Sequence, residues 1–319
     1  MDPLDFSVYR FLSPEGAARF WAGRRRLDPR VTPREIAERV GISETAVRTR
    51  LQHLTERGFL RDKAVVPNPS LFGKRVFVAD LLVKQSAEVD RILRDLTLLD
   101  GVVFTRDLMD EDERKIQVYF VSETEASAAR FANLLGRISP EPAAVVARPY
   151  YIPECDGQLS PLDWRVFLSV WHHPDSTLAQ IAEDVGVSVK TAGRSYHRLI
   201  DTRACWWTHG PESEEFPLAL VRTDLRSPKA VDSVQGWIDR EAPAWMPVAS
   251  DGFGSDPGSV ATTIVGLVPA DLPTVLERFL RKLAARDGVV GVGRTFSLGS
   301  VIYTAWFADR ALALTHRPV

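Results

Sequence analysis

The chain has 319 residues, of which 45% are hydrophobic and 26% charged, so its composition excludes wholesale disorder and indicates globular domains. That length suits two to four small domains, and no stretch reaches the roughly 18 apolar residues that a membrane span requires. The start, Met1-Asp2-Pro3, lacks the basic-then-apolar order of a signal peptide, and Cys155 and Cys205 form no Cys-x-x-Cys pair. We therefore expect a cytoplasmic location, two unpaired thiols and no membrane contact.

Positive charge is concentrated near the N-terminus, although the whole chain carries a formal net charge of −2. Between Arg19 and Arg75 there are 14 Lys and Arg against 6 Asp and Glu, a local charge of +8. Phosphate binding depends on this local field rather than on the sum over the protein. A basic segment on an acidic body favours a double-stranded DNA partner.

The strongest motif predicts a winged helix-turn-helix at about residues 32–68. Thr32 to Glu35 has the pattern of a helix capping box with proline at the first position, and Gly41 allows the left-handed residue that ends this helix. Ser43 is the expected cap of a second, recognition helix that runs to about Arg57. We expect a wing to follow.

The outward side of this recognition helix is polar and basic. Arg48 is the expected bidentate contact to guanine, and Thr45 and Thr49 are expected at thymine methyls or phosphates. The remaining predicted DNA contacts position the helix on the backbone or border its N-terminus. They are Ser43, Glu44, Arg50, His53, the wing residues Arg61 and Lys63, and the preceding Arg24, Arg25 and Arg26.

The next segment has a strand and helix order typical of a ferredoxin-like domain, β-α-β-β-α-β. Hydrophobic periodicity predicts strands at 75–83, 102–108, 115–121 and 143–151, and helices at 87–99 and 124–138. The acidic run at 109–113 is expected to be a solvated turn.

The chain repeats itself. Ile36-Ala37-Glu38-Arg39-Val40-Gly41-Ile42-Ser43 recurs 145 positions later as Ile181-Ala182-Glu183-Asp184-Val185-Gly186-Val187-Ser188, with six of eight positions identical. The fold class predicted is α+β, with two tandem modules, each a winged helix-turn-helix followed by a ferredoxin-like βαββαβ domain. The expected boundaries are 1–70, 71–153, 154–212 and 213–319.

The second copy keeps the helix-turn-helix scaffold but changes its exposed side. Gly193 stands in the place of Arg48, and Trp206 and Trp207 lie in the wing. Candidate secondary DNA contacts are Lys190, Arg194 and Arg198. The later elements predicted are strands at 217–223, 260–268 and 289–306, helices at 228–240 and 272–286, and a loop at 249–258.

These residues resemble the Lrp/AsnC family of transcription regulators. The resemblance is carried by the Ile36–Ser43 octet, by the Val47, Arg50, Leu51, Leu54 and Gly58-Phe59-Leu60 pattern, and by Val66-Pro67-Asn68-Pro69. It implies a DNA-binding domain followed by a ligand-sensing and dimerising (RAM-like) domain. The chain departs from the family in having two modules, and in the acidic run at 107–112 where the family tends to have a glycine-containing ligand loop.

The resemblance implies a sequence-specific transcription regulator that acts through its N-terminal helix-turn-helix. We expect a homodimer or an intramolecular pseudo-dimer, with a small-molecule effector as a further candidate partner, no catalytic residues, no cofactor and no metal, and hence no enzyme. One alternative is a siroheme-decarboxylase-like enzyme on a tandem Lrp/AsnC scaffold. Its chemistry needs basic and histidine side chains in the ferredoxin-like halves, where His316 is the only histidine. A protein-interaction module is the other alternative.

Overall fold

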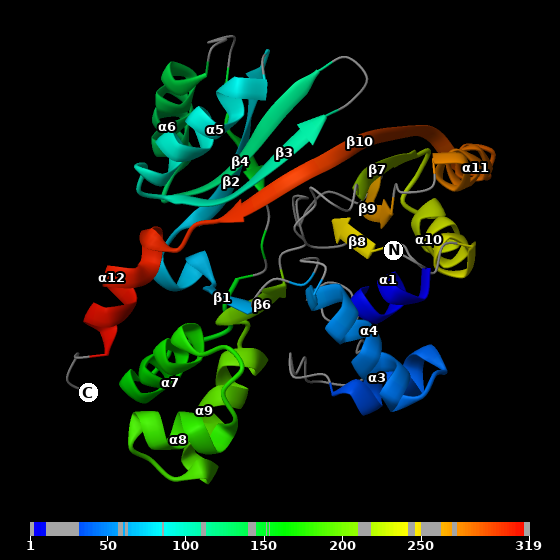
Figure 1. The fold of residues 1–319 in the computed structure, drawn as a ribbon. Coiled ribbons are helices and arrows are strands. Elements are labelled where there is room, and N and C mark those ends of the chain that lie inside the picture. Colours follow the sequence, from blue (N-terminus) through cyan, green and yellow to red (C-terminus); the bar gives the residue numbers. More distant parts are fainter. Residues whose placement is uncertain are drawn as a thin grey trace.

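The computed structural model describes residues 3–10, 32–56, 60, 63–84, 86–109, 113–139, 145–150, 152, 154–209, 218–241, 246–249, 263–269 and 273–315. Among these residues no helix combines the length and the apolar character needed to cross a membrane. The secondary structure alternates helix-turn-helix units with ferredoxin-like units, which confirms the predicted fold class (Figure 1).

The elements of the first copy begin with three helices of a helix-turn-helix unit and continue into a ferredoxin-like unit. In chain order they are α1 (Pro3–Arg10), α3 (Pro33–Val40), α4 (Glu44–Glu56), β1 (Lys63–Pro67), η1 (Pro69–Phe72), β2 (Arg75–Val83), α5 (Ser86–Thr97), β3 (Val102–Met109), β4 (Arg114–Ser122), α6 (Glu125–Ile138) and β5 (Arg148–Tyr150).

The second copy repeats this order and adds a helix at its end. Its elements are α7 (Pro161–His172), α8 (Leu178–Val185), α9 (Val189–Asp201), β6 (Cys205–His209), β7 (Leu218–Leu225), α10 (Ala230–Glu241), β8 (Met246–Ala249), β9 (Thr263–Pro269), α11 (Pro273–Ala284), β10 (Val289–Ile302) and α12 (Ala305–Leu314). The short strand β8 has no counterpart among the predicted strands, and most of the predicted loop at 249–258 lies outside the described residues.

Both ferredoxin-like units belong to one antiparallel sheet of eight strands, in the order β5-β2-β4-β3-β10-β7-β9-β8. Each unit contributes four strands in the ferredoxin-like order, and the two units join where β10 pairs with β3. The two predicted sensing sheets therefore pair edge to edge within one chain, which removes one free edge from each unit.

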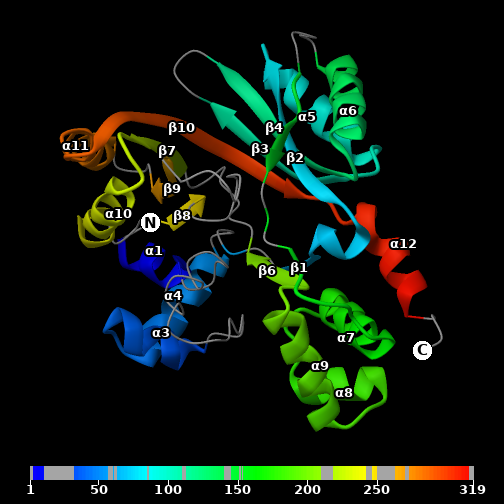
Figure 2. The same ribbon diagram turned by 180° about the vertical axis from the view of Figure 1, so that it is seen from behind.

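Each unit covers the same side of the sheet with its own pair of helices. Apolar side chains of β2, β3 and β4 pack against α5 and α6, and those of β7 and β9 pack against α10 and α11. The unit α7–α9 packs on the opposite side of the sheet, against residues of β2, β3 and β4 that alternate with those facing α5 and α6. Both helix-turn-helix units lie below the sheet in the two views (Figures 1 and 2).

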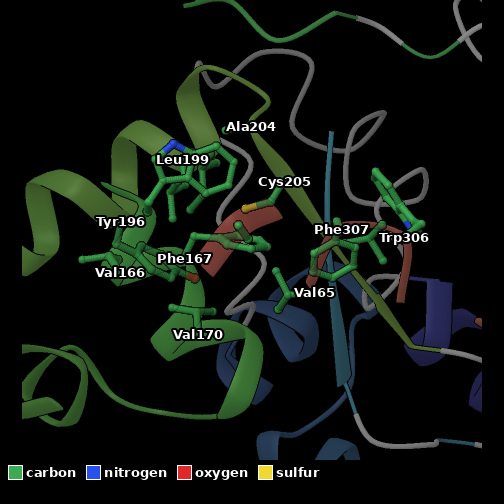
Figure 3. Close-up of a cluster of buried hydrophobic side chains, with 14 of the residues drawn as sticks. Val65, Val166, Phe167, Val170, Tyr196, Leu199, Ala204, Cys205, Trp306 and Phe307 are labelled. Carbon is green, nitrogen blue, oxygen red and sulfur yellow. The ribbon is translucent and has the colours of Figure 1, made fainter. Parts of the chain in front are cut away.

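The two helix-turn-helix units are connected differently to this sheet. The unit α7–α9 shares one large core with β1, β6, the sheet and α12, in which Phe307 and Trp306 are buried (Figure 3). The unit α1, α3 and α4 has a small core of its own around Val8, Ile36 and Val47. The predicted strand at 289–306 is corrected here, because the chain leaves the sheet after Ile302 and Trp306 lies in α12.

A two-stranded sheet joins the two copies between their helix-turn-helix units. Strand β1 pairs with β6 antiparallel, and Lys63 stands opposite His209. His209 lies 145 positions after Ala64, so the strands pair at nearly equivalent points of the repeat. An antiparallel pair of equivalent strands has a local pseudo-twofold axis, and the segments predicted as wings therefore connect the copies.

Candidate nucleic-acid interface

Helix α4 has the geometry of a recognition helix. It follows α3 through Gly41, whose φ of 77° is the left-handed conformation that ends α3, while the Thr32 and Glu35 side chains and backbone form the predicted capping box at its start. The Ser43 hydroxyl accepts a hydrogen bond from the Ala46 amide at 3.1 Å, which fixes the first turn of α4. Val47 is buried, so the opposite side of α4 faces solvent.

The residues expected to read DNA lie on that solvent side, and two of them, Arg48 and Thr49, also form hydrogen bonds within α4. Ser43, Thr45, Arg48, Thr49 and His53 are exposed. The Arg48 guanidinium donates to Glu44 Oε1, with Nη2 at 2.6 Å, so a base contact must compete with this pair or share Arg48 with it. The Thr49 hydroxyl donates to the Thr45 carbonyl at 3.1 Å, which leaves its methyl group and its acceptor lone pairs for DNA.

Arg50 has a different role from the one predicted. Its guanidinium donates to the carboxylate of Asp5 on α1, and the Asp5 side chain is 8% exposed. This placement corrects the expectation that Arg50 points toward phosphates, because the ion pair directs it into the contact between α1 and α4. Arg24, Arg25, Arg26 and Arg61 lie outside the described residues, and Lys63 is placed by its backbone in β1.

The second unit has an equivalent acidic anchor. Asp163 on α7 is 2% exposed and accepts a hydrogen bond from the Ser195 hydroxyl, while Arg198 Nη1 donates to it at 3.1 Å. Ser160 caps α7 and also donates to Asp163, from its backbone nitrogen at 2.8 Å and from its hydroxyl at 2.7 Å. Burial by itself raises the pKa of Asp163, but the hydrogen bonds from Ser195 and Ser160 and the Arg198 charge outweigh it and hold that pKa below its ordinary value.

The two anchors occupy matching positions in the repeat, which the sequence interpretation missed. Pro3-Leu4-Asp5 recurs as Pro161-Leu162-Asp163, but 158 positions later rather than 145. Asp5 binds Arg50 and Asp163 binds Ser195, and those two partners are again 145 positions apart. The first copy therefore has 13 more residues between its first two helices than the second copy has. With this insertion taken into account, Pro3–Arg10 corresponds to α7 and is the first helix of its unit.

The exposed side of α9 differs from that of α4. Lys190 and Arg194 are exposed, and neither forms an ion pair with any residue that the structure describes. Arg198, the third candidate secondary contact, is held by Asp163. Trp206 and Trp207 are placed by their backbones in β6, opposite Val66 and Val65.

A comparison with protein families identifies the first unit. A family of winged helix-turn-helix DNA-binding domains matches residues 26–61, which include α3 and α4. Residues 26–61 are therefore similar to helix-turn-helix domains of the DNA-binding type. A comparison with curated proteins finds no match.

Solved structures similar to this chain fall into two groups. One structure of the siroheme decarboxylase NirDL, in co-complex with an iron-uroporphyrin III analogue, is 10% identical, covers 97% of this chain and 96% of that chain, and has a TM-score of 0.48. An AsnC family transcriptional regulator from Agrobacterium tumefaciens is 21% identical over 47% of this chain and 89% of that chain, with a TM-score of 0.32. LrpC of B. subtilis is 15% identical over 47% of this chain and 91% of that chain, with a TM-score of 0.30.

The prediction that this chain is not an enzyme is contradicted, because the NirDL siroheme decarboxylase structures are similar to it along almost the whole length of both chains. At identities of 10–21% these likenesses concern the fold. Each regulator spans about half of this chain, as one module does. The chain is similar to solved structures of the Lrp/AsnC type, and its own fold contains two copies of a helix-turn-helix unit followed by a ferredoxin-like unit in one polypeptide.

Proposed function

We propose that this chain is a sequence-specific DNA-binding transcription regulator of Lrp/AsnC type, in which α4 reads base edges in the major groove. The observation that carries the proposal is the solvent side of α4, where Thr45, Arg48 and Thr49 are exposed together. A recognition helix places polar residues of this kind against bases, and arginine is the commonest bidentate partner of guanine. The surrounding segment, with its local charge of +8, supplies attraction to phosphates.

The proposal includes an intramolecular pseudo-dimer. In a symmetric dimer, two equivalent helix-turn-helix units are related by a twofold axis. Here the equivalent strands β1 and β6 pair between the two helix-turn-helix units. The two ferredoxin-like units join head to tail, because β3 is the second strand of its unit and β10 is the fourth strand of the other. These two contacts support a monomeric chain that presents two helix-turn-helix units to one duplex.

The test begins with selection of genomic DNA fragments by the purified full-length chain at two salt concentrations, followed by sequencing. Enrichment of one motif, with affinity that falls steeply as salt rises, is the expected result. Failure to bind any fragment at low salt contradicts the proposal.

Arg48→Ala is expected to weaken binding to the selected motif by about 10- to 100-fold, the cost of one lost bidentate base contact. Binding to unrelated DNA should change little, because phosphate contacts carry it. Arg91→Ala is the matched control, since Arg91 also forms an i,i+4 pair on an exposed helix, with Asp95 at 3.2 Å. Equal affinities of the two variants for the motif, measured by fluorescence anisotropy, contradict the role of Arg48.

A second candidate function is chemistry on a substrate rich in carboxylates, and a polar row on the sheet supports it. The side chains of this row lie on β2, β3, β4 and β5. Arg148 Nη2 donates to Asp80 at 2.7 Å, Gln117 donates to Asp80 at 3.0 Å, and the Tyr119 hydroxyl donates to Gln117 at 2.6 Å. Arg106 stacks over the Tyr119 ring at 5.9 Å. Arginine side chains in such a row suit carboxylate recognition.

Titration of the chain with siroheme, followed by the absorption of the tetrapyrrole, tests this candidate. Saturable binding that Arg106→Ala weakens, together with release of CO₂, supports catalysis on this substrate. A spectrum that does not change at micromolar protein removes the candidate and leaves the DNA-binding proposal untouched.

A further inference from the structure

The solvent side of α9 borders an open groove of about 720 Å³, lined by residues of α8 and α9. Gly193 lies within the groove, 145 positions after Arg48, the residue proposed to read bases in the first unit. Leu178 of α8 borders the groove, and a Cβ placed on Gly193 lies 3.6 Å from its Cδ1, an ordinary contact. Glycine is therefore not required here by packing, and its effect is to leave α9 without a long side chain at its centre.

Positive charge surrounds the groove. Lys190 and Arg194 line it one helical turn apart, and His197 lines it three residues after Arg194. Asp201 is the one acidic residue among those that line the groove. A surface of this charge attracts an anion, while the absence of a central Arg or Asn-like side chain removes the usual means of reading a base edge.

The position of the groove relative to α4 indicates which anion occupies it. The β1–β6 pair lies between the two helix-turn-helix units, and α4 and α9 both lie below the sheet in the two views (Figures 1 and 2). A duplex that is bound to α4 and runs along this side of the molecule reaches α9. Of the anions that fit a groove lined by exposed cations, the sugar–phosphate backbone of that same duplex is the one that the fold brings to it.

We propose that the α9 groove binds the DNA backbone without reading its sequence, so that one chain recognises an asymmetric site. That site consists of one specific half-site under α4 and a flanking segment of any sequence under α9. This inference rests on the proposed DNA binding by α4 and specifies what the second unit contributes to it. The operator expected on this basis is a single half-site with a preferred flank, whereas two units that both read sequence would select a pseudo-palindrome.

The test measures binding of the full chain to duplexes that carry the selected half-site with about 10 additional base pairs on one side or on the other, one helical turn away. We expect the wild type to gain affinity from the flank on one side only, by a similar factor for several unrelated flank sequences. The double variant Lys190→Ala/Arg194→Ala is expected to lose this gain, roughly ten-fold, and to reduce the slope of log K against log salt by about 1.8. Its selected half-site motif stays unchanged.

The control variant Arg130→Ala/Arg137→Ala removes the same charge from α6, where both residues are exposed on the other side of the sheet. If it lowers the salt slope as much as the groove variant does, the effect is one of net charge and the inference is overturned. The inference also fails if the wild type binds the half-site equally well with and without flanks, or if the second unit selects its own motif. Each of these results leaves Arg48-dependent binding to the half-site in place, so the proposed function still holds. Loss of all DNA binding by the wild type instead contradicts the proposed function.

Discussion

Phe307→Ala is expected to lower the free energy of unfolding by about 3–5 kcal/mol, the cost of emptying a buried aromatic site. Phe307 is fully buried, and its ring lies 5.1 Å from the ring of Trp171 and 6.0 Å from that of Phe167, both on α7. It therefore anchors α12 to the second helix-turn-helix unit. Urea denaturation gives the loss for the whole chain, and hydrogen exchange of the α7 amides shows whether the loss is located there.

Leu312→Ala is the control for this prediction, because Leu312 lies on the same helix and is 53% exposed. Its cost is expected to stay below about 1 kcal/mol. If both variants are equally stable, α12 does not contribute to the core in the way that the packing of Phe307 indicates.

Asp163→Ala is expected to cost about 2–4 kcal/mol, since it leaves the buried Ser195 hydroxyl without its acceptor and removes the acidic half of the α7 capping box. Arg198 is 56% exposed at its side chain and is solvated once it is released, which limits the cost. Asp184→Ala on the exposed side of α8 is the control and is expected to change stability by less than about 0.5 kcal/mol. Thermal unfolding followed by circular dichroism compares the two variants.

The pH dependence of the Asp163 effect has a definite sign. Because folding lowers the pKa of Asp163, the carboxylate contributes its stability above its unfolded pKa, and that contribution disappears as pH falls through the folded pKa. The difference in unfolding free energy between wild type and Asp163→Ala is therefore expected to be constant near neutral pH and to shrink below about pH 4. A difference that grows on acidification contradicts the assigned role of the carboxylate.

Much of the local structure follows from the sequence because its signals act within one or two turns of chain. Thr32, Glu35 and Gly41 specify the ends of α3 through hydrogen bonds to neighbours at most four residues away, and Thr177 and Gly186 do the same for α8. The apolar, β-branched runs of β2 and β4 likewise predict the strands of the ferredoxin-like unit.

Helix α12 shows where such signals fail. Its first residue follows Thr304, whose side chain makes no capping hydrogen bond, so nothing local marks the start of a helix after the glycine-containing strand β10. The segment is helical because Phe307 and Ala311, four residues apart, then face the same buried cluster. The contact with α7, and not the intrinsic preference of the segment, selects its conformation.

Some features of the candidate interface likewise follow from the sequence, and others depend on the tertiary structure. The sequence by itself determined the repeat, the two helix-turn-helix units, the position of Arg48 on the solvent side of α4, and its replacement by Gly193 in α9. Only the tertiary structure decided that Arg50 belongs to Asp5, that Arg198 belongs to Asp163, and that β10 pairs with β3 and β1 with β6. The physical reason is that backbone pairing between strand edges needs no particular side chain, and an ion pair between distant segments exists only once folding has brought its two charges together.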